Sequence, residues 1–267
     1  MNVRESAVNG MFYPKQKQAL ERQISGFLKG LDSGGKKSAA IIAPHAGYTY
    51  SGKTAAIAFS ELKKAETFVI LGPNHTGLGK QISVSDADYW ETPLGKIQVD
   101  SELRKKLLEG LGTGADDLAH LQEHSIEVQV VFLQFLFPRA KILPICIMEN
   151  NLEKLKKFGC VLAETINEKE VSIVASSDFS HFVPLENARK KDLAAIGFIE
   201  KIDVEGFYKE VAEKKLSICG FAPIIIAMEY CRQKGYKKAS LLKYDSSATA
   251  SGDESSVVGY AAIKFEK

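Results

Sequence analysis

The chain has 267 residues, with 45% hydrophobic and 25% charged side chains, a composition typical of one or two globular domains. The formal net charge of +2 is too small to indicate a nucleic-acid partner, and no apolar run approaches the roughly 18 to 20 residues that cross a membrane. The first residues show no signal-peptide core and the four cysteines form no CxxC pair, so we expect a cytoplasmic protein without a zinc ribbon or a disulfide framework.

Apolar periodicity predicts alternating helices and strands along the first half of the chain. Helices show apolar residues at three- and four-residue spacing, whereas buried strands are short continuous apolar runs. We expect helices at 15–31, 53–63, 101–109 and 124–137, strands at 38–43, 67–71 and 81–85, a surface turn at 31–37, and a turn followed by a strand within 91–100.

The second half continues this alternation. It predicts strands at 141–148, 171–176, 239–244 and 257–265, and helices at 151–167, 184–200, 204–214 and 223–234. The polar run 245–256 is expected to be a mobile loop that lets the last two strands pair antiparallel. The pattern as a whole predicts a single α/β domain over residues 1–267, with a largely parallel or mixed sheet covered on both faces.

Two histidines follow predicted strands in glycine-flanked segments, His45 in APHAGYTYSG and His75 in LGPNHTG. In α/β proteins the loops at the carboxyl ends of strands carry the chemistry. The separation of the two histidines is close to the roughly 30 residues of one βαβ unit, so we expect their strands to be neighbours. A neutral imidazole is the commonest metal ligand, so the pair indicates a metal site. The alternative is two turn histidines that bond backbone carbonyls.

Further polar side chains accompany these two segments. SSDFSH follows the predicted strand 171–176, and its Asp178 is placed to fix the tautomer of His181 for acid/base work, unless it only caps the next turn. His124 in EHSIEVQ opens a predicted helix, where Glu123 and Glu127 favour the helix dipole with or without a site.

One cysteine differs from the other three in its surroundings. Cys219 lies in SICG, just ahead of the predicted helix 223–234. A thiol near a helix amino terminus has a lowered pKa, which favours a thiolate ligand or a redox group; the alternative is a buried structural cysteine. His120, one turn before His124, is expected to be structural. Tyr48, Tyr50 and Trp90 are expected in the core, or else as a flat wall of a binding pocket.

Taken in order, these motifs resemble those of the Memo family, including its prokaryotic members of the AmmeMemoRadiSam system protein B type. The resemblance runs from about residue 4 to the end and rests on GMFYP, APHAGYTYSG, GPNH, ETPLG, EHSIEVQ, SSDFSH, the CG ahead of the helix at 223, and YDSSA. The family is similar in fold to the class III non-haem iron extradiol dioxygenases. The resemblance therefore implies one αβα domain around a central mixed sheet.

The resemblance also implies a site and a cofactor. It places metal ligands at His45, His75 and Cys219, puts Asp178 beside the metal, and implies copper or iron as the cofactor. His181 would do acid/base work, with His124 close by. A thiolate in place of the dioxygenases' glutamate favours copper or reduced iron and puts ring cleavage in doubt. The partners implied are an AMMECR-type protein and a radical SAM protein, and in animal members phosphorylated receptor peptides.

Three functions compete at this point. The first is a copper- or iron-dependent oxidoreductase with a His/His/Cys site, acting on oxygen or a small aromatic. The second is a non-catalytic module in which helix amino termini after LGPNHTG and SSDFSH bind a peptide or a small anionic ligand. The third is a metallo-hydrolase, which would need harder ligands than Cys219.

Overall fold

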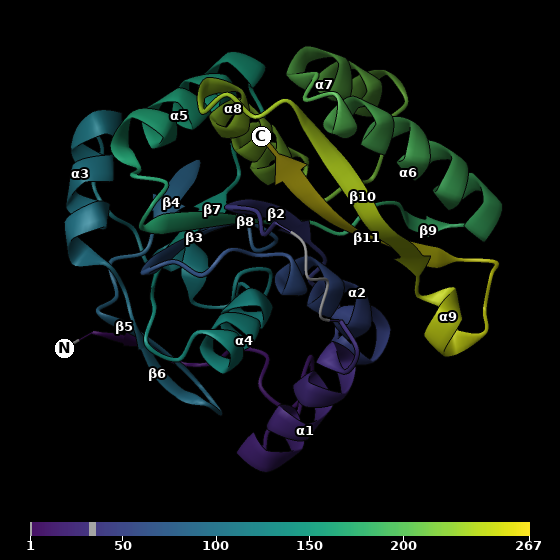
Figure 1. Cartoon of the computed structure of the whole chain (residues 1–267), viewed down its shortest axis with the longest axis horizontal. Coiled ribbons are helices and arrows are strands. Elements are labelled where there is room, and N and C mark those ends of the chain that lie inside the picture. Colours follow the sequence, from purple (N-terminus) through teal and green to yellow (C-terminus); the bar gives the residue numbers. More distant parts are fainter. Residues whose placement is uncertain (1, 32–35) are drawn as a thin grey trace.

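The computed structural model describes residues 2–31 and 36–267 (Figure 1). The strands of the main sheet are Ala40–Ala43 (β2), Thr67–Pro73 (β3), Ile82–Val84 (β4), Lys141–Ile147 (β7), Val171–Ser176 (β8), His181–Val183 (β9), Lys238–Ser246 (β10) and Val257–Glu266 (β11). Their order is β10-β11-β2-β8-β3-β7-β4, and β9 pairs with β11. The central strands β2, β8, β3 and β7 are parallel, whereas the pairings of β4, β9, β10 and β11 are antiparallel. The predicted mixed sheet is confirmed.

The central strands are buried on both faces because their residues are apolar or small, except for the exposed Lys141 at the start of β7. All residues of β2, β3 and β8 are buried, as expected for parallel strands covered by helices on each side. One expectation is wrong: β2 and β3, which precede His45 and His75, are not neighbours, because β8 lies between them. A spacing of about 30 residues indicates one crossover unit, but it does not reveal whether a later strand is inserted between the two strands of that unit.

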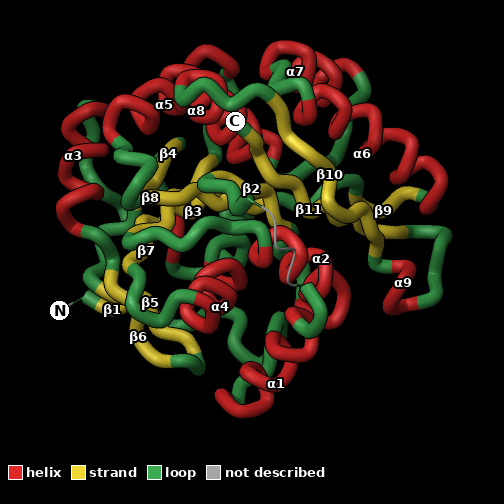
Figure 2. Tube along the Cα trace, in the orientation of Figure 1, coloured by secondary structure: helices red, strands yellow, loops and turns green. Residues whose placement is uncertain are grey.

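Helices cover the sheet on both faces, so the molecule has three layers (Figures 1 and 2). The helices α5 and α8 pack on one face, together with α3, α6 and α7, and α1, α2 and α4 cover the other. The helices are Lys17–Leu28 (α1), Tyr48–Ser60 (α2), Ser101–Leu111 (α3), Glu127–Leu136 (α4), Leu152–Thr165 (α5), Leu185–Glu200 (α6), Val204–Glu213 (α7), Phe221–Gln233 (α8) and Ala248–Ser251 (α9), with a 3₁₀ turn at Leu118–His120. Within the described ranges, none of these helices is long and apolar enough to cross a bilayer.

A small second sheet contains the amino-terminal strand of the described chain. Its strands are Val3–Arg4 (β1), Tyr89–Thr92 (β5) and Gly95–Gln98 (β6), in the order β1-β5-β6. The guanidinium of Arg4 lies 4.4 Å from the centre of the Trp90 ring and forms a buried ion pair with Glu127 of α4. Glu127 also accepts hydrogen bonds from Ala7 N (2.8 Å) and Val8 N (3.1 Å). The segment ahead of α1 is therefore fixed to α4.

Several predicted boundaries differ from the structure. Helix α2 begins at Tyr48, five residues before the predicted 53, because the chain turns into the helix directly after Gly47. Helix α4 begins at Glu127 rather than at 124, because His124 and Ser125 lie in a turn in which their backbone N–H groups bond to the Glu123 carboxylate. The run 245–256 is not a loop throughout, since β10 extends into it and α9 follows. Part of the predicted turn 31–37 lies outside the described residues. The antiparallel pairing of β10 with β11 is confirmed.

Candidate metal centre

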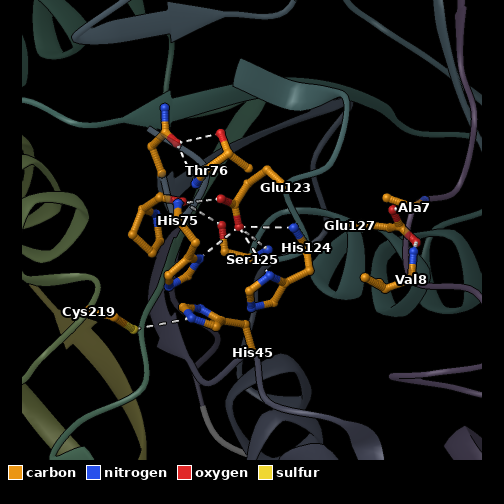
Figure 3. Close-up of polar contacts among 12 residues, drawn as sticks. Ala7, Val8, His45, His75, Thr76, Glu123, His124, Ser125, Glu127 and Cys219 are labelled. Carbon is orange, nitrogen blue, oxygen red and sulfur yellow. Dashed lines mark hydrogen bonds and ion pairs between the residues drawn. The ribbon is translucent and has the colours of Figure 1, made fainter. Parts of the chain in front are cut away.

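Three side chains from distant parts of the chain meet at the carboxyl edge of the parallel strands. His45 follows β2, His75 follows β3, and Cys219 lies two residues ahead of α8. Their ligand atoms lie within 4.8 Å of one another (Figure 3). The two histidines meet although β8 separates their strands: the ring centroids are 5.3 Å apart.

The buried imidazole of His45 is fixed by its neighbours on β8. Its Nδ1 lies 2.9 Å from Ser176 Oγ. The Ser176 hydroxyl donates its own hydrogen to Ser125 O at 2.7 Å, so it accepts a hydrogen bond from Nδ1–H. The Nε2 of His45 consequently carries a lone pair, and it faces Cys219 Sγ at 3.2 Å. This is the tautomer that a metal ligand requires.

The imidazole of His75 is fixed by the buried carboxylate of Glu123. Nδ1 of His75 lies 2.9 Å from Glu123 Oε1, and the backbone N of the same histidine donates to Oε2 at 2.5 Å. A carboxylate only accepts, so Nδ1 carries the hydrogen and Nε2 has the lone pair. The sequence alone indicates only a favourable position for Glu123 near a helix start; it identifies the two motifs, LGPNHTG and EHSIEVQ, but not the contact between them.

His124 lines the same site without joining the His45, His75 and Cys219 group. Its ring stacks on His75, with centroids 4.6 Å apart and an interplanar angle of 18°, and packs against Phe12 at 4.6 Å. Its Nδ1 lies 3.5 Å from Glu123 Oε1. His75, Glu123 and His124 thus form a second group of ligand-type side chains that shares one histidine with the first.

Asp178 and His181 lie beside the site but are not hydrogen-bonded to each other in the described contacts. Asp178 Oδ1 accepts from His45 N at 2.8 Å. His181 Nδ1 donates to Ser217 O at 2.7 Å, and its backbone N donates to Ser217 Oγ at 2.8 Å. The expectation that Asp178 fixes the tautomer of His181 is therefore wrong: a backbone carbonyl does so, and the carboxylate holds the loop of His45.

The thiol of Cys219 is held between His45 and the loop after β8. It receives a hydrogen bond from Asp178 N at 3.3 Å. Burial, followed by the nearby Asp178 carboxylate, raises the pKa of the Cys219 thiol well above its usual range, so the lowered value expected near a helix start is wrong for the metal-free protein. Gly220 permits the close approach, because a Cβ there would lie 2.3 Å from Ser176 O.

Burial keeps two imidazoles of the site, those of His45 and His124, neutral. Burial, and then the neighbouring histidines, lower the pKa of His45 well below its usual value. Burial also lowers the pKa of His124 to about 4, against the raising effect of Glu123. For Glu123 burial is the largest single cause and acts to raise the pKa, but the electrostatic effect of His75 and the hydrogen bonds from His75 and Ser125 together outweigh it and lower the pKa to about 2. At neutral pH the imidazoles of His45 and His124 are therefore neutral, and the Glu123 carboxylate beside them is ionised.

The other residues singled out from the sequence lie outside the His45, His75 and Cys219 group. His120 is buried, and its Nε2 lies 3.0 Å from Ser83 O, as a structural histidine would. Tyr48 and Trp90 are core residues, whereas Tyr50 is 48% exposed. LGPNHTG is followed by β4 rather than by a helix, so the helix terminus expected there is absent from the described chain. SSDFSH leads through the short strand β9 into α6, which begins at Leu185, close to the predicted 184.

The donor set fits a transition metal of intermediate or soft character. Ligands of a four-coordinate ion at roughly 2.0–2.3 Å lie on the order of 3.5 Å apart, close to the 3.2 Å between Cys219 Sγ and His45 Nε2. Two imidazoles and a thiolate suit copper, iron or zinc better than magnesium or calcium, which prefer oxygen ligands.

The fold and these side chains define a three-layer α/β protein with a His/His/Cys cluster at the carboxyl edge of a mixed sheet. The chain belongs to the Memo family: the Memo-like protein family model matches residues 4–264. A MEMO1 family protein of Aquifex aeolicus is 44% identical over 99% of this chain and 100% of its own length, and one of Methanosarcina mazei is 43% identical over 100% of both. The crystal structure of an uncharacterized Escherichia coli K12 protein is similar in fold, with a TM-score of 0.58 and 13% identity over 84% of this chain and 98% of that one.

Proposed function

We propose that this protein binds copper or iron through His45, His75 and Cys219 and works as a metal-dependent redox protein. The observation that carries the proposal is the convergence of three ligand atoms within 4.8 Å of one another, on segments far apart in the sequence. The hydrogen bonds of both histidines leave their Nε2 lone pairs free for a metal.

The thiol of Cys219 determines which metal ions the proposed site prefers. Thiolate ligands favour copper(I) and iron over harder ions, and a bound metal deprotonates a coordinating thiol outright. The raised pKa of Cys219 in the metal-free protein then makes metal binding release a proton from this thiol. A copper or iron ion held in this way supplies one-electron chemistry, and the thiol counts against the metallo-hydrolase.

Three further side chains with acid/base groups, Asp178, His181 and His124, lie around the proposed metal position. His181 is half-buried next to Asp178, and His124 stacks on His75 at the rim of the cluster. Burial raises the pKa of Asp178 to about 6, against its hydrogen bond from His45. Asp178 is therefore positioned to take or give a proton near neutral pH, with His181 beside it as the acid/base imidazole, and a small ligand would approach from the exposed side of His75.

The proposal is tested by metal binding of purified, metal-stripped protein. Copper(I) is titrated against a chromogenic chelator without oxygen, and iron(II) in the same way, on the parent and on His45→Ala, His75→Ala and Cys219→Ser. We expect one equivalent in the parent and a loss of affinity of at least about tenfold in each variant, or about 1.4 kcal/mol. The matched control is Cys160→Ser, which changes another half-buried thiol far from the cluster. Equal binding by all four variants would refute the proposal.

A further inference from the structure

We propose that Glu123 is a positioning residue for His75: it selects the imidazole tautomer and ring orientation that turn Nε2 of His75 toward His45 and Cys219. The inference rests on the proposed metal site. Glu123 is not one of the three proposed metal ligands, and it is not one of the two side chains, Asp178 and His181, proposed for proton transfer.

Glu123 is completely buried and its two carboxylate oxygens receive four N–H groups. Oε2 accepts from His75 N at 2.5 Å, and Oε1 accepts from His75 Nδ1, from His124 N and from Ser125 N, each at 2.9 Å. These donors occupy the carboxylate, so Glu123 is not available as a metal ligand in this arrangement. The second ligand-type group, His75, Glu123 and His124, therefore supports the proposed metal ligands and is not a separate metal site (Figure 3).

A capping role accounts for only part of these contacts. Such a role covers the backbone N–H groups of His124 and Ser125, which lie in the turn ahead of α4. It does not explain the bond to the side chain of His75, which lies 48 residues earlier. Metal-ligating histidines typically donate their second N–H to a carboxylate or carbonyl, which fixes the ring and raises its basicity.

His75 has particular need of such support. Its side chain is 32% exposed, whereas the His45 residue is 2% exposed and is packed within the core. Ser176 holds Nδ1 of His45, and Glu123 holds Nδ1 of His75. The two ligands thus have equivalent supports on different elements, and loss of the second leaves the exposed ring of His75 oriented by its ring contacts alone.

The chain contains a matched control four residues away. Glu127 is as buried as Glu123 and is equally hydrogen-bonded, but its partners are Arg4, Tyr13 and the backbone N of Ala7 and Val8. Figure 3 shows Glu123 among the histidines and Glu127 next to Ala7 and Val8. The variants Glu123→Gln and Glu127→Gln therefore make the same chemical change at two buried carboxylates, only one of which touches His75.

The amide of Glu123→Gln keeps the size of the side chain but offers one acceptor oxygen, in place of two, to the four N–H groups. Its NH2 group then faces an N–H group in either orientation, which weakens the hydrogen bond that keeps the hydrogen on Nδ1 of His75 and favours its transfer to Nε2, the atom that faces the metal. Two measurements follow: nitrogen-15 NMR of the histidine tautomers in metal-free protein, and copper(I) affinity by chelator competition. We expect Glu123→Gln to shift His75 to the Nε2–H tautomer and to weaken binding about 10- to 100-fold, with Glu127→Gln unchanged in both.

The outcomes separate this inference from the proposed function. If the parent binds copper(I) but Glu123→Gln keeps both the tautomer and the affinity, the positioning role is refuted and the metal site stands. A fall in affinity as large in Glu127→Gln refutes it too, because the effect is then general destabilisation. If the parent binds neither copper nor iron, the proposed function fails, and the tautomer measurement alone decides whether Glu123 orients His75.

Discussion

Acid sensitivity of the fold follows from the burial of His120. This side chain is completely buried; its Nε2 bonds to Ser83 O at 3.0 Å, and its ring lies edge-on to Trp90 with centroids 5.6 Å apart. Its Nδ1 has no hydrogen-bond partner among the described residues. Burial lowers the pKa of His120 from 6.5 to about 4, although the contact with Ser83 opposes the shift.

The sign of the effect follows from proton binding. Between pH 6.5 and about 4 the unfolded chain carries a proton on this histidine and the folded chain does not, so the free energy of unfolding falls as the pH is lowered. From the two pKa values, this one group costs about 2 kcal/mol of stability between pH 7 and pH 5, and about 3 kcal/mol once the pH is below 4.

The assay is urea unfolding of metal-free protein at pH 7 and pH 5, on the parent and on His120→Gln. The glutamine keeps a donor for Ser83 O but does not titrate. We expect the variant to be less stable at pH 7, yet to lose about 2 kcal/mol less than the parent on going to pH 5. An identical loss in both proteins would show that His120 is not a buried neutral histidine.

Three further predictions concern stability and access. Gly220→Ala places a Cβ 2.3 Å from Ser176 O and should lower the free energy of unfolding by about 1–3 kcal/mol in thermal or urea unfolding, whereas Gly26→Ala, with nothing within 4 Å, should not destabilise. Arg4→Met leaves Glu127 buried without its cation and should cost about 3–5 kcal/mol by the same assay; an unchanged value would contradict the buried ion pair. In mass-spectrometric mapping of a thiol reagent, Cys160 and Cys219 should react before the two buried cysteines, and copper(I) should protect Cys219 alone; protection of Cys160 as well would contradict the site.

The sequence predicted the central sheet well because each buried strand is a short apolar run between turn residues. β2, β3 and β8 lie close to where their composition places them. Strand order was not predictable in the same way. Whether a strand nearly 100 residues later in the chain is inserted between two earlier ones depends on helix packing on both faces, and no local pattern records it.

The candidate ligands were identifiable because histidines at strand ends and a cysteine before a helix lie in distinctive short motifs. Glu123 was not, because a glutamate near a helix start has an adequate local explanation. Its contact with His75 depends on the loop after β3 lying against the start of α4, which is a tertiary arrangement. The pKa of Cys219 was mispredicted for a related reason: burial and the Asp178 carboxylate dominate over the nearby helix terminus.

X-ray absorption of copper(I)-loaded protein tests the central claim most directly, because it reports the ligand types on the metal. The account predicts one sulfur and two imidazole nitrogens at the copper, with the sulfur contribution lost in Cys219→Ser and one imidazole lost in His75→Ala. Cys160→Ser should give the parent's spectrum. A parent spectrum with nitrogen and oxygen ligands only, or one unchanged by Cys219→Ser, would contradict the assignment of His45, His75 and Cys219 as the metal site.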